Sequence, residues 1–330
     1  MAHTFPADLI DYSTARRLIG AGGWLLEKLG GPDLMLAVAC FRLRDQYQLI
    51  FADGEQISIP LALLFRLAGW IHRPRLVTIA HVLSVRKKMI FLDIFRVHKA
   101  IDLFWVYCSW QKEFIQRRWR LPAERVVFTP FMVDSCFFAP WQVQADEPLP
   151  GIPENGDRPV LCSVGLEYRD YATLIEAVRG LDVQVVIAAA SPWSKRPDTT
   201  QELEIPPNVT VRRFSQYELR SLYARSSFVV MPLFPVDFQA GVTTLLEAMA
   251  MEKAVICTRT PGQTDVVIGG ETGLYVEPGD PDGLRAAIER LLDNREEAQE
   301  MGRKGRRRVE QEMSLERYVS RLIEDIERIP

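Results

Sequence analysis

Residues 234–258 read FPVDFQAGVTTLLEAMAMEKAVICT, and this stretch carries the clearest structural signal in the chain. An apolar strand ends near Leu233, a short loop follows, and a helical pattern begins around Thr243 and continues to about Met251. A helix that starts in this way presents unpaired backbone N–H groups and the positive end of its dipole, which suits a phosphate group. Gly241 has no Cβ, so a ligand can approach the backbone closely just before the helix.

Glu247 lies one turn inside this helix, on the side that can face a ribose bound at the helix tip. A carboxylate in that position accepts hydrogen bonds from two vicinal hydroxyls. The alternative is that Gly241 and the threonines cap a core helix and that Glu247 is a surface acid. The spacing alone leaves both interpretations open.

The second half of the chain alternates between strand-like and helical patterns. Runs such as VQVVIAAA and FVVMPL are almost continuously apolar, which is typical of strands covered by helices on both faces. This alternation predicts a doubly wound parallel sheet, on which ligands bind beyond the carboxyl ends of the strands. The expected strands are Val160–Gly165, Val183–Ala189, Val209–Arg213, Phe228–Leu233, Ala254–Thr258 and Gly273–Val276, and the expected helices are Tyr171–Arg179, Gln216–Arg225, Thr243–Met251 and Pro281–Asp293.

The first half repeats this pattern less clearly and predicts a second, smaller α/β layer. Gln142–Asp157 holds three prolines and several acids and separates the halves as a linker does. The tail, Glu296–Arg328, is helical in pattern, and its Arg303–Arg308 cluster is interpreted as a solvated helix face. The expected strands are Leu34–Ala39, Leu49–Ala52, Leu76–His81, Leu103–Ser109 and Val126–Thr129, and the expected helices are Ser13–Leu29, Ser58–Ile71, Arg86–Ala100 and Trp110–Trp119.

The loop and helix of residues 234–258 resemble the E-x7-E signature of retaining glycosyltransferases of family 4, which have the GT-B fold. Glu247 matches the second Glu of that signature, whereas Gln239 stands at the first position and supplies no negative charge. The match covers roughly residues 75–330, and the first 75 residues match poorly. Other segments that agree in order are Val126–Asp134, Ser163-Val164-Gly165 with Arg169, Pro261-Gly262-Gln263 with Asp265, Gly270–Leu274 and Pro278-Gly279-Asp280.

The resemblance implies an α/β chain with two Rossmann-like, doubly wound domains that face each other across a cleft, the first of them shortened. It implies an acceptor-side domain over residues 1–145, a nucleotide-sugar-binding domain over residues 146–313, and a helix over residues 314–330 that packs back on the first domain. The loop with Lys195 and Arg196 departs from the family pattern, so a phosphate contact there is left open. The implied catalytic residues are His81, Arg169 and Gln239, and the implied donor-binding residues are Gly165, Ser215, Ala240, Gly241, Val242, Thr243 and Glu247.

The implied reaction is transfer of a sugar from a nucleotide-diphosphate donor to a hydroxyl acceptor with retained anomeric configuration. The amides at Gly241–Thr243 and the Arg169 guanidinium stabilise the departing diphosphate in this scheme. Fixed dipoles and an arginine can replace a metal, so neither a metal nor another cofactor is predicted. Two alternatives stay open: a catalytically silent glycosyltransferase-like binding protein, favoured by Gln239, and a nucleotide-sugar epimerase of GT-B fold. The acceptor is unidentified, with lipid-linked and glycan acceptors both open.

Composition is that of a globular protein, with 48% hydrophobic and 25% charged residues among 330. The longest apolar stretches, Leu61–Ile71 and Val77–Val85, fall short of the roughly 18 residues that span a bilayer. The five cysteines form no C-x-x-C pair and are interpreted as buried thiols of a reducing cytoplasm. No cationic segment followed by an apolar one opens the sequence, so no signal peptide is expected.

Charge is distributed unevenly, with 18 Lys and Arg against 14 Asp and Glu in residues 1–150, and 22 against 29 in the remainder. A mildly basic first half is compatible with an anionic membrane surface, although ordinary scatter of charge is the simpler interpretation. No run of aromatics interleaved with cations indicates nucleic-acid binding. The predicted location is cytoplasmic, with peripheral contact at the inner face of the membrane left open. The first-half aromatics are expected mainly in the core: Trp70, Phe91, Phe95, Trp105 and Trp110.

Overall fold

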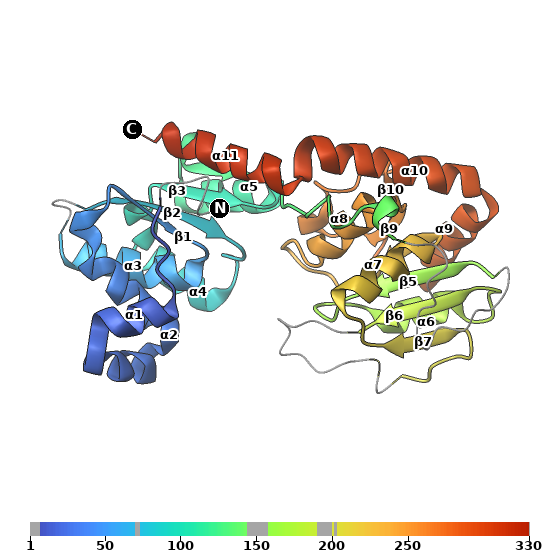
Figure 1. The fold of residues 1–330 in the computed structure, drawn as a ribbon, viewed down its shortest axis with the longest axis horizontal. Helices are drawn as coiled ribbons and strands as arrows, with labels where there is room; N and C mark the ends of the chain where they lie inside the picture. The colour runs from blue at the N-terminus through green and yellow to red at the C-terminus, as the bar shows by residue number, and fades with distance from the viewer. Residues whose placement is uncertain (1–6, 70–72, 144–157, 190–199, 201–202, 330) are drawn as a thin grey trace. The chain divides into compact units, whose positions relative to one another are not determined.

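The computed structural model describes residues 7–69, 73–143, 158–189, 200 and 203–329. The chain forms two compact units, Met1–Thr129 and Pro130–Pro330, and each contains one parallel β-sheet with helices packed on it (Figure 1). The expected boundary between residues 145 and 146 falls outside the described residues, so the domain limits stay a prediction. Within the ranges given above, no helix combines the length and the apolar character needed to cross a bilayer.

The first unit is built on a four-stranded sheet in the order β1-β2-β3-β4, and all neighbouring strands are parallel. Apolar side chains from the strands and from helices α1 to α5 form its core. Four of the five strands predicted for this half are confirmed. The strands are β1 (Leu49–Ala52), β2 (Arg75–Ala80), β3 (Leu103–Val106) and β4 (Val126–Phe128), and the helices are α1 (Tyr12–Ile19), α2 (Gly23–Arg42), α3 (Glu55–Leu67), α4 (Arg86–Asp93) and α5 (Ser109–Trp119).

The fifth predicted strand, Leu34–Ala39, is wrong, because these residues lie inside α2. Gly31 interrupts this helix with φ 79° and ψ 178°, and Pro32 then occupies the first turn of the segment that continues. Proline is well suited to a first turn, where its missing N–H would have no helical partner. A short apolar run looks the same in a buried helix and in a buried strand, so its periodicity did not separate the two.

The second unit is built on a six-stranded parallel sheet in the order β10-β9-β8-β5-β6-β7. This is the doubly wound order in which the strand sequence reverses between two central strands, here β5 and β8. The strands are β5 (Val160–Val164), β6 (Gln184–Ala188), β7 (Val209–Arg212), β8 (Phe228–Met231), β9 (Val255–Thr258) and β10 (Gly273–Val276). The helices are α6 (Tyr171–Val178), α7 (Gln216–Arg225), α8 (Val242–Ala250), α9 (Pro281–Asp293), α10 (Arg295–Arg308) and α11 (Leu315–Glu327).

Alternate residues of the second sheet face two separate apolar cores. Cys162 and Val164 of β5 pack in the core that includes α7 and α8, whereas Leu161 packs with α6 and α9. Because both faces are covered, nearly every strand residue is buried, which explains the continuous apolar runs of the sequence. The predicted doubly wound sheet is confirmed for this unit. Four of the five cysteines are buried as predicted, and Cys136 is exposed.

The C-terminal tail is helical as predicted, but its arginine cluster is not uniformly solvated. Arg306 is 5% exposed, and its Nη1 donates to the carbonyl oxygens of Phe138 and Ala250, both at 2.7 Å. Its Nε donates to Glu310, also at 2.7 Å. Ala250 is the last residue of α8, where a cation suits the negative end of the helix dipole. Arg306 therefore ties α10 to α8, which corrects the expectation for this residue.

The aromatics of the first unit divide between core and surface. Trp105 is fully buried as expected, and Trp110 is half-buried. Phe91 is 36% exposed and Phe95 is 46% exposed, so the expectation of a core position is wrong for these two. Trp70 lies outside the described residues. These two phenylalanines therefore form an apolar surface on and just after α4.

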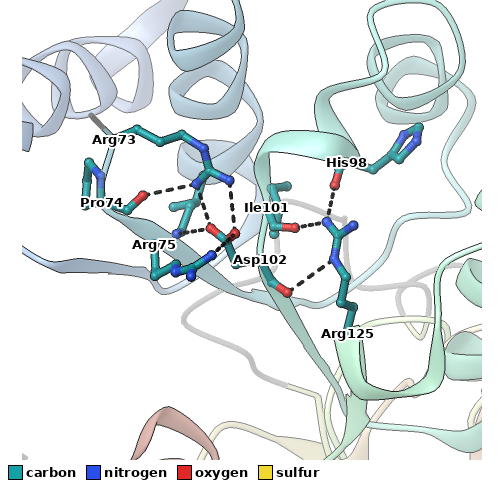
Figure 2. A network of polar contacts seen from close by, with 8 residues as sticks. Arg73, Pro74, Arg75, His98, Ile101, Asp102 and Arg125 are labelled. Atoms are coloured by element: carbon teal, nitrogen blue, oxygen red, sulfur yellow. Dashed lines mark hydrogen bonds and ion pairs between the residues drawn. The ribbon is translucent and has the colours of Figure 1, made fainter. Parts of the chain in front are cut away.

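A polar cluster fixes the amino ends of β2 and β3 (Figure 2). The Asp102 carboxylate accepts two hydrogen bonds from Arg73, at 2.6 and 3.0 Å, and one from the backbone N–H of Leu76 at 2.7 Å. Arg125 donates to the backbone carbonyl oxygens of His98 at 2.8 Å and of Asp102 at 3.4 Å. Ligands of parallel sheets bind at the opposite edge, beyond the carboxyl ends of the strands, so we assign this cluster a structural role.

Candidate functional site

Two loops lie side by side in the second unit at the reversal of strand order. One follows β5 and covers residues 165–170, and the other follows β8 and covers residues 232–241. Backbone hydrogen bonds join them, from the N–H of Asp170 to Pro232 at 3.2 Å and from the N–H of Phe234 to Tyr168 at 3.0 Å. Such a switch point is where open parallel sheets bind their ligands.

Arg169 is buried at the centre of these two loops, with 3% of its surface exposed. Its Nε donates to the carbonyl oxygen of Val164 at 2.8 Å, Nη1 to that of Glu167 at 2.9 Å, and Nη2 to the hydroxyl of Thr244 at 3.3 Å. All three acceptors are neutral. Burial lowers the pKa of Arg169 below its ordinary value. A buried cation with neutral partners retains a strong attraction for an anion.

Gly165 and Gly241 leave the space that this guanidinium occupies. A Cβ on Gly165 would come within 2.7 Å of Arg169 Nη2, and a Cβ on Gly241 within 2.5 Å of the same atom. Both glycines also have positive φ, 103° and 72°, which side-chain-bearing residues rarely adopt. The two loops therefore place their glycine backbones directly against the Arg169 side chain.

Helix α8 begins beside Arg169, and no side chain among the residues that the structure describes caps its first amides. The unpaired N–H groups and the positive end of its dipole therefore lie next to Gly241. Thr243 is exposed at this end, while Thr244 is buried and its hydroxyl lies 3.4 Å from the carbonyl oxygen of Val164. The positive potentials of the helix terminus and of the guanidinium add together at one place. An anion is therefore favoured there.

Glu247 is buried, with 6% of its surface exposed, so the surface-acid alternative is wrong. The Tyr223 hydroxyl of α7 donates to its Oε2 at 2.9 Å. Burial raises the pKa of Glu247 to about 7, although the bond from Tyr223 opposes that shift. A buried acid whose pKa lies near neutrality beside an anion site is typical of a functional residue.

The side-chain amide of Gln239 is buried without a partner. Neither its Oε1 nor its Nε2 makes a hydrogen bond to any residue that the structure describes. A buried polar group left unsatisfied costs about 1–3 kcal/mol. Vicinal hydroxyls of a sugar both donate and accept, so they can satisfy both atoms of this amide.

The turn after β9 packs against the loop that carries Gln239. A Cβ on Gly262 would overlap the backbone of Phe238, so the close contact requires a glycine here. Gln263 is fully buried and donates from Nε2 to the carbonyl oxygen of Ala240. In the described part of the chain, its Oε1 and the buried Thr260 hydroxyl have no partner. Gln263 therefore holds the loop that leads into α8.

Ser215 lies apart from this cluster within the second unit, and His81 belongs to the first unit. Ser215 follows the edge strand β7 and caps α7, and its hydroxyl and its N–H exchange hydrogen bonds with Glu218 at 3.3 and 2.7 Å. Its backbone N–H is thus already engaged. His81 is exposed at the carboxyl end of β2 in the first unit. Lys195 and Arg196 lie outside the described residues.

The buried carboxylate of Glu55 holds the loop that carries His81. Glu55 is 2% exposed, and it accepts the N–H groups of His81 at 2.9 Å and Val82 at 3.0 Å and the Lys88 ammonium at 2.5 Å. Burial raises the pKa of Glu55, but Lys88 and the two amides more than offset it, so the pKa lies below its ordinary value. Glu55 is the first residue of α3 and Lys88 lies in α4, so this contact joins the two helices to the His81 loop.

Sequence reasoning missed the partners that hold the predicted residues. Tyr223 lies 24 residues before Glu247 and has no local pattern that links them. The sequence did contain a signal for Thr244, because this residue lies in the first turn of the predicted phosphate-binding helix. Gln263 lies within a segment that resembles the family, but its buried amide becomes visible only when the two loops are packed together.

The chain has two parallel sheets covered by helices, and a buried arginine lies where the strand order of the second sheet reverses. This architecture is the GT-B fold of glycosyltransferases. Residues 147–308 match the family model described as Glycosyl transferases group 1, just under half of the chain. The crystal structure of Anabaena Alr3699/HepE in complex with UDP and glucose superposes with a TM-score of 0.69, over 94% of this chain and 83% of that chain. Its sequence identity is 15%, so the likeness shows the fold alone.

Curated relatives match parts of the chain. The capsular polysaccharide biosynthesis glycosyltransferase CapM of Staphylococcus aureus is 37% identical over 82 residues, 25% of this chain and 22% of the relative. The alpha-D-kanosaminyltransferase of Streptomyces kanamyceticus is 28% identical over 193 residues, 55% of this chain and 49% of the relative. The chain thus matches a quarter to a half of the length of these relatives. The predicted resemblance is confirmed for glycosyltransferases of group 1, and membership of family 4 stays a prediction.

Proposed function

We propose that the chain is a retaining glycosyltransferase that moves a sugar from a nucleotide-diphosphate donor to a hydroxyl acceptor without a metal. The observation that carries the proposal is the convergence of the buried Arg169 guanidinium and the uncapped start of α8 on one point. A diphosphate supplies the negative charge that this point lacks. Glu247, one turn further along the helix, is the proposed acceptor of hydrogen bonds from the donor's ribose.

The proposed mechanism is mainly electrostatic. Cleavage of the glycosyl–phosphate bond places negative charge on the departing diphosphate, and the Arg169 guanidinium and the amides of Gly241–Thr243 stabilise that charge as it forms. These groups are fixed before the reaction, because Arg169 is held by three hydrogen bonds and packed against two glycines. The leaving phosphate accepts the proton of the acceptor hydroxyl on the same face of the sugar, which gives retention. His81 is proposed to contact the transferred sugar.

A screen of donors tests the proposal. The thermal unfolding midpoint is measured with UDP-, GDP-, ADP- and dTDP-sugars, and one nucleotide class is expected to raise it, because a ligand that binds only the folded state stabilises it. UDP is the first candidate, since the structural relative HepE binds UDP and glucose. The selected donor is then incubated with glycan and lipid-linked acceptors. The absence of any stabilising nucleotide would contradict the proposal.

Removal of divalent metal is expected to leave transfer unchanged. Arg169 and the dipole of α8 already supply the positive charge that a metal would otherwise place beside the diphosphate. The measurement is the rate of nucleoside diphosphate release with EDTA and with added Mg²⁺ or Mn²⁺. A rate that EDTA abolishes and that a metal restores would refute metal independence.

Replacement of Gln239 by leucine is expected to weaken binding of the intact donor about tenfold, because a hydrogen bond to the sugar is lost. Affinity for the nucleoside diphosphate alone is expected to stay the same. Calorimetry with both ligands separates a sugar contact from general damage to the loop. Equal losses for the two ligands would remove Gln239 from the sugar site.

A second candidate function is a donor-binding protein without turnover. The neutral Gln239 at the position of the signature's first acid is the observation that favours it. The two functions differ in the release of nucleotide from a bound donor across a broad acceptor panel. Turnover that appears only in the Gln239→Glu variant would support the silent protein.

A further inference from the structure

Helix α4 and the residues beside it carry an exposed apolar face that the proposed reaction does not use. Ile90, Phe91 and Ile94 are 48%, 36% and 70% exposed, and Phe95 is 46% exposed. Ile94 caps α4 and donates its N–H to the carbonyl oxygen of Ile90 at 2.9 Å, so Ile90 and Ile94 share one side of the helix, whereas Phe95 lies just beyond it. The two phenyl rings lie 5.7 Å apart. Leu92, on the opposite side, is fully buried in the core of the first unit.

Two cations precede the apolar residues on the same sides of α4. Arg86 precedes Ile90 by four residues, and Lys87 precedes Phe91 by four; both cations are exposed. The neighbouring Lys88 does not belong to this set, because it is bound to the buried Glu55. The face thus has two exposed cations at one end and four large apolar side chains at the other.

The acid on this helix does not cancel that positive charge. Asp93 accepts hydrogen bonds from both the guanidinium of Arg118, at 2.6 and 3.2 Å, and the indole N–H of Trp119, at 2.8 Å. The Arg118 guanidinium lowers the pKa of Asp93, so this carboxyl is ionised and paired at neutral pH. Arg96 and Lys99, beyond the helix, are exposed cations as well.

We propose that this face of residues 85–96 docks on an anionic lipid surface. An exposed helix with cations aligned to large apolar side chains is the pattern of an interfacial element, in which the cations meet lipid phosphates and the apolar side chains enter the acyl boundary. A symmetric contact with a second copy is disfavoured, because Asp93, the acid of this helix, is already paired with Arg118 and would not neutralise the cations of the other copy. The face therefore fits a bilayer with anionic headgroups.

Docking at this face would present the His81 loop to the lipid surface. His81 and α4 are joined by only a short segment, and Glu55 binds both the His81 N–H and Lys88 of α4. If the proposed glycosyl transfer is accepted, its acceptor is then a lipid-linked hydroxyl. That extension rests on the proposed function, whereas docking itself does not.

The test measures sedimentation of the full chain with vesicles of phosphatidylcholine alone and with vesicles in which about a third of the lipid is phosphatidylglycerol. Binding to the anionic vesicles is expected, weakening as salt rises from about 0.1 M to about 0.5 M. The Arg86→Gln and Lys87→Gln variants are each expected to lower the partition coefficient about fivefold. Both changes are on the surface, so the variants are expected to fold.

Ile94→Glu tests the apolar contribution, with Leu67→Glu as its matched control. Leu67 is 77% exposed at the end of α3 in the same unit, but lies outside the proposed face. Ile94→Glu is expected to abolish binding to anionic vesicles, and Leu67→Glu to leave it unchanged. The thermal unfolding midpoint of each variant, measured in parallel, shows whether the chain has folded.

Three outcomes would overturn the docking proposal. The first is that the unaltered chain does not bind anionic vesicles. The second is that Ile94→Glu and Leu67→Glu reduce vesicle binding equally, and the third is that the chain is a dimer in solution which Ile94→Glu converts to a monomer. Nucleotide binding, measured by calorimetry on the same samples, is expected to be unaffected by Ile94→Glu. A chain that binds vesicles but no nucleotide would refute the proposed function and leave docking intact.

Discussion

Replacing Arg169 by methionine is expected to lower the rate of nucleotide release from the donor by about a hundredfold to a thousandfold. The guanidinium is the proposed partner of the departing diphosphate, and its interaction strengthens as charge develops on the leaving group. Affinity for a nucleoside diphosphate is expected to fall as well, whereas affinity for the corresponding nucleoside stays the same. The measurements are single-turnover kinetics and calorimetry with the two ligands.

Arg306→Met is the matched control for this variant. Arg306 is also a buried arginine that donates to backbone carbonyl oxygens, but it lies at the C-terminal end of α8, away from the candidate anion site. The control is expected to lose stability without a selective loss of diphosphate affinity. If Arg169→Met keeps its rate, or if both variants lose diphosphate and nucleoside affinity alike, Arg169 is not the diphosphate partner.

Glu247→Gln is expected to affect stability and binding in opposite directions. The folded-state pKa of Glu247 is about 7, above the ordinary value of 4.5, so folding favours the protonated acid. The free energy of unfolding therefore falls as pH rises from about 4.5 through about 7, by as much as about 3 kcal/mol. Glutamine does not titrate and can still accept from Tyr223, so the variant is expected to be more stable at pH 8 and about equal at pH 4.

The same change is expected to weaken donor binding about tenfold at pH 8, because a neutral amide accepts weaker hydrogen bonds from ribose hydroxyls than a carboxylate does. Binding of the unaltered chain is expected to weaken as pH falls below about 7, where Glu247 takes up a proton. A nucleotide sugar suits this titration, since it has no terminal phosphate to titrate. A variant that gains stability at pH 8 without losing donor affinity would show that Glu247 does not hold the ribose.

The sequence predicted the second unit well, because its strands are buried on both faces and its helices begin with clear signals. Gln216–Arg225 and Pro281–Asp293 agree with α7 and α9 at both ends. Ser215 and Asp280 supply side-chain caps at their starts, which fix the first residue of each helix. The Leu34–Ala39 segment failed, because burial removes the periodic pattern that separates a helix from a strand.

Sequence reasoning predicted part of the candidate site. Gly241 and Glu247 were identified because helix starts and spacing are local features. Glu247 binds Tyr223, which lies on a different helix, and Lys88 binds Glu55, which also lies on a different helix. Neither pair has a sequence spacing from which the contact could be predicted. Long-range pairs of this kind appear only once the elements are packed.

A crystal structure of the chain with a nucleotide sugar tests the central claim most directly. Oxygens of the diphosphate are expected within hydrogen-bond distance of the Val242 and Thr243 amides and of the Arg169 guanidinium, with the ribose hydroxyls on Glu247. A donor bound with its phosphates elsewhere, or a helix terminus left in contact with solvent while the donor occupies another surface, would contradict this account.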